Sequence, residues 1–230
     1  MKYKHILALA GIFAALSALV ACSGGPAMMK QIMPQSGFLP NYSLLEPVTD
    51  TPSGTRVWRY RKAGVNPGVY TGVIIDSVYL NQFNFTKEIT PEVIAQTKYV
   101  LQESIRQAVD NKGGIAIVSQ PGPGVARISV GITGAEVSAD GLKPWNFTPI
   151  GLAASAATYA AGVNSKTPAL IVENKITDSR TNEFLGGGLI VIEGETFRTG
   201  AGSIESFQDM AKRAVVAAVR LSANPINSSR

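Results

Sequence analysis

A short apolar run near the amino terminus, followed by the only cysteine of the chain, decides which residues can belong to a folded domain. Lys2 and Lys4 precede the uncharged stretch 6–20, and Cys22 follows closely. As a helix this stretch spans roughly 22 Å, which is short of the ~30 Å hydrocarbon core of a bilayer. The run therefore favours a secretory signal peptide over an uncut transmembrane anchor.

The residues Leu19, Val20, Ala21 and Cys22 resemble the lipobox of bacterial lipoproteins. The resemblance implies that the Cys22 thiol receives diacylglycerol, that cleavage occurs before this cysteine, and that a fatty acid such as palmitate acylates the new amino group. Two or three acyl chains hold a protein stably on a membrane, at about 0.8 kcal/mol per buried methylene. Ser23, rather than an aspartate, comes next, which favours the outer membrane under the enteric sorting rule. We therefore expect a protein anchored in the outer membrane through Cys22 and facing the periplasm.

The rest of the chain lacks the side chains that common hydrolases use. The only histidine, His5, lies in the expected leader, and the only cysteine is the one expected to carry lipid. Zinc sites made of Cys and His ligands are therefore excluded, as are nucleophiles activated by a histidine. The groups that remain available for catalysis are carboxylates, lysine, tyrosine and serine–lysine pairs. We expect no assignable catalytic residue, no metal and no cofactor.

The charge balance does not indicate a nucleic-acid partner. The formal charge of +5 includes both leader lysines, so the expected mature chain is only slightly basic, and it contains no basic run. The one local basic cluster consists of Arg56, Arg59, Arg61 and Lys62, interrupted by two aromatic residues. Such a cluster is typical either of a contact with an anionic lipid or polymer, or of the solvated face of an extended segment.

Composition divides the mature chain into a tether and one domain. Gly, Pro and Met residues are frequent in 22–35, which we interpret as a flexible tether. The remainder, 36–230, is predicted to form a single domain. Its alternating or short apolar stretches favour strands. We predict strands at 55–60, 70–80, 115–118, 125–135, 167–178 and 184–195, of which the last two form a hairpin.

Two amphipathic helices complete the predicted fold. Thr90 can cap the first helix, and Pro91 suits its first position because a missing N–H is tolerated there. Apolar residues then recur every three or four positions over 90–109, and again over 207–219. Hairpin-linked strands with two such helices indicate an α+β fold, a mostly antiparallel sheet covered on one face by both helices. The segment 136–166 fits either a small-residue helix or a loop.

A set of short motifs, spread in order over nearly the whole mature chain, is similar to a known family. The motifs are SGFL at 36–39, the strand before Asp76, PGPG at 121–124, and 173–178 together with Ser179 and Thr181. They resemble the bacterial domain-of-unknown-function family 3313. The resemblance implies an envelope lipoprotein, and it implies no particular reaction.

Two features are candidate binding sites, each with a structural alternative. Trp145 and Phe147 lie in a glycine-rich segment, where they could anchor a partner or be buried. Gly186, Gly187 and Gly188 interrupt a predicted strand, which indicates either a bulge or the close approach of a partner strand or a glycan chain.

Three functions are compatible with these residues. The first is a non-enzymatic binding or structural module, whose envelope-protein or cell-wall-glycan partner docks on the sheet edge or on 136–166. The alternative is an enzyme acting on envelope glycans through paired carboxylates, which lie roughly 5–10 Å apart across a cleft. Glu193 and Glu195 share a strand face, although an exposed sheet face explains them better. The third is a carrier of a lipid or small ligand, which requires an apolar cavity of several hundred Å³.

Overall fold

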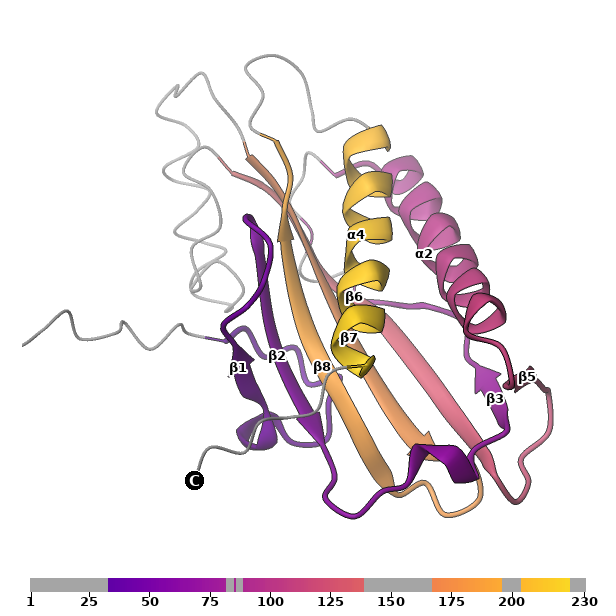
Figure 1. Cartoon of the computed structure of the whole chain (residues 1–230). Coiled ribbons are helices and arrows are strands. Elements are labelled where there is room, and N and C mark those ends of the chain that lie inside the picture. Colours follow the sequence, from indigo (N-terminus) through magenta and orange to yellow (C-terminus); the bar gives the residue numbers. More distant parts are fainter. Residues whose placement is uncertain (1–32, 82–84, 86–88, 139–166, 196–203, 224–230) are drawn as a thin grey trace, which may run out of the picture. The chain divides into compact units, whose positions relative to one another are not determined.

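An eight-stranded sheet with two long helices forms the framework of the protein (Figure 1). This computed structural model describes residues 33–81, 85, 89–138, 167–195 and 204–223, all within the compact unit Met33–Arg230. The helices are α2 (Pro91–Lys112) and α4 (Ile204–Ala223). The strands are β1 (Glu46–Val48), β2 (Thr55–Arg61), β3 (Gly72–Ile75), β4 (Tyr79–Leu80), β5 (Ala116–Ile117), β6 (Val125–Ser138), β7 (Thr167–Asp178) and β8 (Phe184–Glu193).

The strand order across the sheet is β1-β2-β8-β7-β6-β3-β5, and β4 pairs with a later part of β6. The pairings from β1 to β6 are antiparallel, and the long strands β6, β7 and β8 form a meander at the centre. β3, β4 and β5 pair in parallel on the other side of β6. The predicted α+β fold with a mostly antiparallel sheet is therefore confirmed.

Helix α2 shows how local sequence defines an element. The Thr90 hydroxyl oxygen accepts a hydrogen bond from the Val93 N–H at 3.2 Å, and Pro91 lies in the first turn. Gly113, with a φ of +68°, follows the last helical residue in a conformation that favours glycine. The buried residues between these ends recur at helical spacing, so one face of the helix packs on the sheet.

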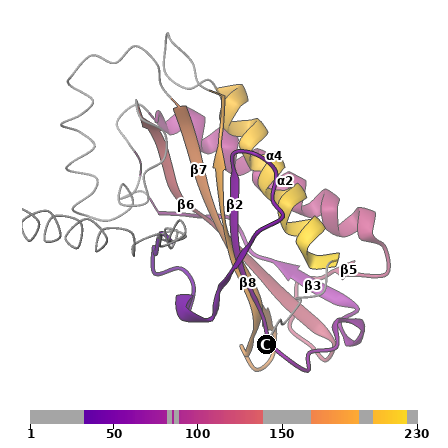
Figure 2. The same cartoon turned by 60° about the vertical axis from the view of Figure 1, so that its left-hand side comes forward.

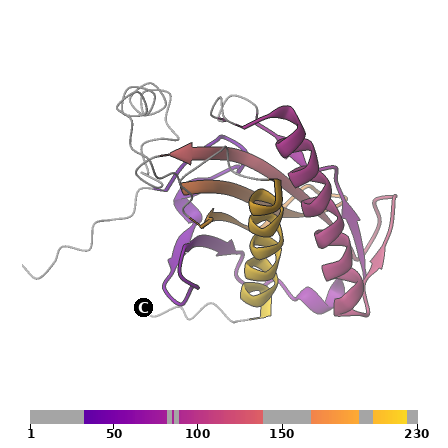
Figure 3. The same ribbon diagram turned by 90° about the horizontal axis from the view of Figure 1, so that it is seen from above.

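Both helices cover the same face of the sheet, as predicted (Figures 1 and 3). Their apolar faces meet the side chains of the central strands in the main core, which includes Leu101, Ile105, Ile132, Ile190, Phe207 and Met210. Burying a side chain of this size contributes about 1.5–3 kcal/mol. The main core therefore fixes the helices on the sheet.

The arm that precedes β1 covers the opposite face, on the side of the sheet away from the helices (Figure 2). This second core includes Leu39, Leu45, Trp58, Ile171 and Leu189. Both cores consist of residues within the unit Met33–Arg230. We therefore expect this unit to fold when it is produced without residues 1–32.

The segment predicted as one strand at 70–80 forms two short strands instead. β3 ends at Ile75 and β4 begins at Tyr79, and between these two pairings β6 advances by one residue fewer than this segment does. The Val78 N–H donates a hydrogen bond to Gln102 Oε1 of α2 at 2.9 Å, so this backbone group bonds to the helix and not to a neighbouring strand. Of the segment 136–166, the end of β6 is described, and 139–166 lies outside the described residues.

Candidate functional site

A groove of about 280 Å³ opens on the helix-covered face of the sheet, at the end where α2 and α4 stop. The strands form its floor, and the last turns of both helices and the segment 65–70 form its walls. Its floor includes Val57, Ala126, Ile128, Asn174, Ile176 and Ile190, and its walls include Val65, Tyr70, Lys112, Ala218, Leu221 and Ser222. Most of these side chains are apolar, so the groove suits an apolar ligand.

The glycine run of β8 produces the hollow. Gly186, Gly187 and Gly188 lie between β2 and β7, and all three line the groove. Because side chains alternate along a strand, Gly186 and Gly188 share the face of Ile190, which packs under the helices. The lack of side chains at these two positions lowers the sheet surface beneath the end of α4. A register shift in the β7–β8 pairing lies beside the run.

The same glycines allow neighbouring backbones to approach closely. A Cβ atom on Gly187 would overlap the carbonyl oxygen of Asn174 in β7. A Cβ atom on Gly186 would lie 2.9 Å from the carbonyl oxygen of Tyr60 in β2. The backbones that approach the glycine run are thus strands of this chain itself.

Three cationic side chains line the groove, and none of the described residues that line it is acidic. Arg59 and Arg61 lie two positions apart on β2 and share a face, and Lys112 is the last residue of α2. Arg59 Nη1 donates a hydrogen bond to the carbonyl oxygen of Leu221 near the end of α4. Burial, and then the nearby charge of Arg61, lower the pKa of Arg59. Positive charge therefore adjoins an apolar floor.

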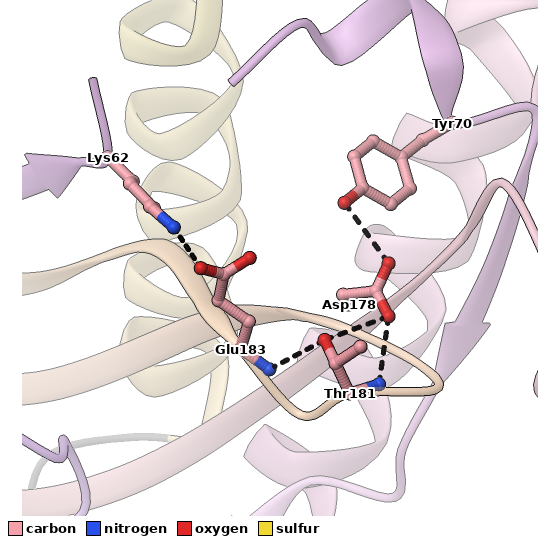
Figure 4. Close-up of polar contacts among 5 residues, drawn as sticks. All are labelled: Lys62, Tyr70, Asp178, Thr181 and Glu183. Atoms are coloured by element: carbon pink, nitrogen blue, oxygen red, sulfur yellow. Dashed lines mark hydrogen bonds and ion pairs between the residues drawn. The ribbon is translucent and has the colours of Figure 1, made fainter. Parts of the chain in front are cut away.

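Polar contacts hold the turn between β7 and β8 beside the groove (Figure 4). Asp178 Oδ1 accepts a hydrogen bond from the Thr181 N–H at 2.9 Å, and its Oδ2 accepts one from the Tyr70 hydroxyl at 3.2 Å. Mainly because of the Thr181 N–H, the pKa of Asp178 lies below its usual value. Glu183 forms an ion pair with Lys62. Both acids of this turn are thus held by partners of their own.

A second polar cluster lies on the opposite face, under the arm. Glu173 is 1% exposed and accepts hydrogen bonds from the Tyr42 hydroxyl at 2.6 Å and the Thr133 hydroxyl at 2.7 Å. The Tyr42 oxygen in turn accepts three N–H groups of the SGFL segment 36–39, at 3.0–3.3 Å. Burial raises the pKa of Glu173, and burial followed by the bond to Glu173 raises the pKa of Tyr42. Because the arm covers the carboxyl group, we interpret this cluster as structural.

The other family motifs also connect segments that are distant in sequence. Asp76 accepts hydrogen bonds from Arg127 Nη1 and the Ser129 hydroxyl, both at 2.7 Å. The Ser179 hydroxyl oxygen accepts the Gly122 N–H at 3.2 Å, which joins the PGPG turn to the β7–β8 turn. Each motif thus has a structural role that a single sequence does not reveal.

Several predicted residues lie outside the described part of the chain. These are the lipobox residues Leu19, Val20, Ala21 and Cys22, and the aromatic pair Trp145 and Phe147. Among the described residues, no helix is both long enough and apolar enough to cross a membrane.

The carboxylates considered for glycan hydrolysis have ordinary surroundings. Glu193 forms an ion pair with Arg56 at 3.3 Å, and Glu195 is exposed beyond the end of β8. Neither residue lines the groove. Within the described ranges, no cluster of three or more His, Cys, Asp or Glu side chains is arranged to hold a metal ion.

Comparison with known proteins finds several that are similar to this chain over 66–74% of its length. The "Uncharacterized lipoprotein YdcL" of Escherichia coli (strain K12) is 25% identical over 171 residues, which cover 74% of this chain and 76% of that protein. The PelC dodecamer structure from Paraburkholderia phytofirmans matches with a TM-score of 0.35 and 9% identity, over 69% of this chain and 95% of that one. Protein XCC0632 from Xanthomonas campestris matches with a TM-score of 0.41 and 10% identity, over 66% and 83%. Neither structural likeness is close enough to support a functional conclusion.

The family comparison agrees with the motif resemblance. The family described as "Protein of unknown function (DUF3313)" matches residues 34–219, which is most of the chain. Together with the similarity to YdcL, this match supports a lipoprotein of unknown function. The chain belongs to the DUF3313 family.

Proposed function

We propose that this protein is a lipid-anchored binding module of the bacterial cell envelope, with its lipid on Cys22 and its ligand in the groove. The groove carries the proposal. Its volume of about 280 Å³ is just below the roughly 300–1,000 Å³ typical of small-ligand sites, and most of its lining is apolar. Of the three functions compatible with the sequence, this observation favours the carrier of a lipid or small ligand.

The anchor belongs to the same proposal. Residues 1–21 are the leader, 22–35 the tether and 36–230 the domain, and Ser23 directs the protein to the periplasmic face of the outer membrane. Similarity to a curated lipoprotein supports lipid attachment. A tethered domain would then hold its groove close to a membrane surface.

A binding role fits the groove better than hydrolysis of an envelope glycan. Glycosidases place two carboxyl groups on opposite sides of the bond that they cleave. The described lining of the groove supplies no carboxyl group. Its charged side chains are all cationic, which suits recognition of a ligand. For the same reason we propose the groove as the ligand site, in preference to the sheet edge or 136–166.

The anchor is tested on the full chain in cells. Inhibition of lipoprotein signal peptidase should leave the leader on the protein, and Cys22→Ser should abolish fatty-acid labelling and release the domain from outer-membrane fractions. Ser23→Ala is the matched control and should remain labelled. A native protein that still begins with Met1, or that has the mass of its residues alone, would contradict the anchor.

The groove is tested on the unit Met33–Arg230 with the neutral apolar dye Nile red. We expect a saturable rise in fluorescence that Ala218→Phe reduces, because the larger side chain fills the groove from α4. Val216→Phe is the control, since Val216 is 67% exposed on the same helix and does not line the groove. Ser222→Phe provides a second groove variant, and thermal unfolding verifies that each variant is folded. Equal dye uptake by the folded groove variants and the control would refute the proposed site.

A further inference from the structure

We infer that the groove takes a single-chain lipid anion, with its acyl chain on the apolar floor and its charged head beside Arg59, Arg61 and Lys112. This inference rests on the proposed function and specifies the class of ligand. It follows from the shape of the groove, the sign of its charge, and the state of the neighbouring acids.

The apolar floor of the groove indicates that the ligand has an apolar part. Ile128 and Ile176 lie on adjacent central strands, and the glycine run beside them leaves an uninterrupted hollow under the end of α4. Ile176 is 36% exposed, which is unusual for a large apolar side chain on a central strand of a sheet. The volume is at the small end of ligand sites, so one chain fits better than the two chains of a phospholipid.

The cationic side chains that line the groove indicate that the head group of the ligand is negatively charged. Arg61 supplies a guanidinium group beside the groove, and a guanidinium binds a carboxylate or phosphate through paired hydrogen bonds. Among the described residues, no carboxylate forms an ion pair with Arg61 or with Lys112. Charge complementarity therefore selects an anion.

Within the described part of the chain, the two acids of the β7–β8 turn form no ion pair with Arg61 or Lys112. Asp178 is occupied by the N–H groups of its own turn and by Tyr70, and Glu183 is occupied by Lys62 (Figure 4). Burial, and then the repulsion of the nearby Arg61 charge, lower the pKa of Arg59, because both disfavour the charged guanidinium. A bound anion would offset this repulsion.

The test uses calorimetry to measure how three ligands, each with a straight ten-carbon chain, bind to the unit Met33–Arg230. Decanoate supplies the anion, decanol the neutral head, and decyltrimethylammonium the cation. We expect decanoate to bind about tenfold more tightly than decanol, as charged hydrogen bonds to a guanidinium would give, and the ammonium ion to bind more weakly than both.

Two substitutions locate the head group. Arg61→Gln should weaken decanoate binding about tenfold and leave decanol binding unchanged. Lys112→Gln is a second variant at the rim, expected to weaken decanoate binding in the same direction. Arg106→Gln is the control, because it removes one exposed positive charge of α2 that does not line the groove. Thermal unfolding again verifies folding.

The outcomes separate this inference from the proposed function. If Nile red binds, but decanoate and the ammonium ion bind with equal affinity, the preference for an anion is refuted and the proposed binding module still stands. Loss of decanoate binding in Arg106→Gln to the same extent as in Arg61→Gln would also overturn that preference. Failure of every ligand and of Nile red to bind would refute the binding module itself, as would a groove occupied by this chain's own terminus or by a second copy.

Discussion

The hydroxyl of Tyr42 donates a 2.6 Å hydrogen bond to Glu173 Oε2 and so joins the amino-terminal arm to the centre of strand β7. The two residues are 131 positions apart. Because Glu173 is buried, its oxygens depend on such donors in place of water. The bond therefore fastens the arm over the second core of the domain.

Replacing Tyr42 by Phe is expected to destabilise the domain by about 1–3 kcal/mol. The change removes one donor to a buried carboxyl group and leaves the N–H groups of 36–39 without their acceptor. The free energy of urea unfolding measures the effect. Tyr99→Phe is the control, since Tyr99 is 66% exposed on α2. Equal stability of the two variants would show that the bond to Glu173 does not hold the arm.

Glu173 should make stability fall as the pH rises. Burial raises its pKa in the folded state above the ordinary value of 4.5, so the folded protein keeps a proton that the unfolded chain releases. Between these two pKa values the unfolded state gains relative stability with increasing pH. Glu173→Gln removes this dependence, because the amide does not titrate. Unfolding curves should therefore show that the stability of the variant increases relative to that of the wild type from about pH 4 upward. A difference that is constant with pH would contradict the raised pKa.

Local elements could be predicted because their signals lie within them. The cap at Thr90, the proline at the next position and the glycine stop at 113 all belong to α2 or its flanks. The alternation along β7, followed by a second strand-like segment, likewise predicted the β7–β8 hairpin. The single strand predicted over 70–80 was wrong, because the Val78 N–H bonds to Gln102, and this contact depends on where the helix packs.

The groove could not be predicted because its parts meet only through strand pairing. The glycine run and the basic cluster were both visible as separate features of the sequence. Their meeting depends on the antiparallel register that places Arg59 opposite Gly188 and Arg61 opposite Gly186. No pattern within either strand specifies that register. The bond between Tyr42 and Glu173 was missed because it joins an irregular arm to a strand 131 positions away.

Gly187→Ala is expected to destabilise the domain by about 1–3 kcal/mol or more, because the new methyl group would overlap the carbonyl oxygen of Asn174. Relief would require β8 to move away from β7. Gly122→Ala is the control, since its methyl group would have Val125 as its nearest neighbour, at 3.7 Å. The control should change stability by less than about 0.5 kcal/mol. Similar melting temperatures for both variants would mean that β7 and β8 can separate at little cost.

Asp178 should make the stability of the domain rise with pH, which is opposite to the effect of Glu173, although both residues belong to β7. The Thr181 N–H lowers the pKa of Asp178 below its ordinary value of 3.8, so the folded state favours the charged form. The resulting stability is present above that value and is lost as the pH falls through the lower pKa of the folded protein. Asp178→Asn should therefore be less stable than the wild type at neutral pH, and the difference should vanish in acid. Glu103→Gln, at an exposed position of α2, controls for loss of one negative charge. A gap between Asp178→Asn and the wild type that persists in acid would show that shape, rather than charge, makes the aspartate favourable in this turn.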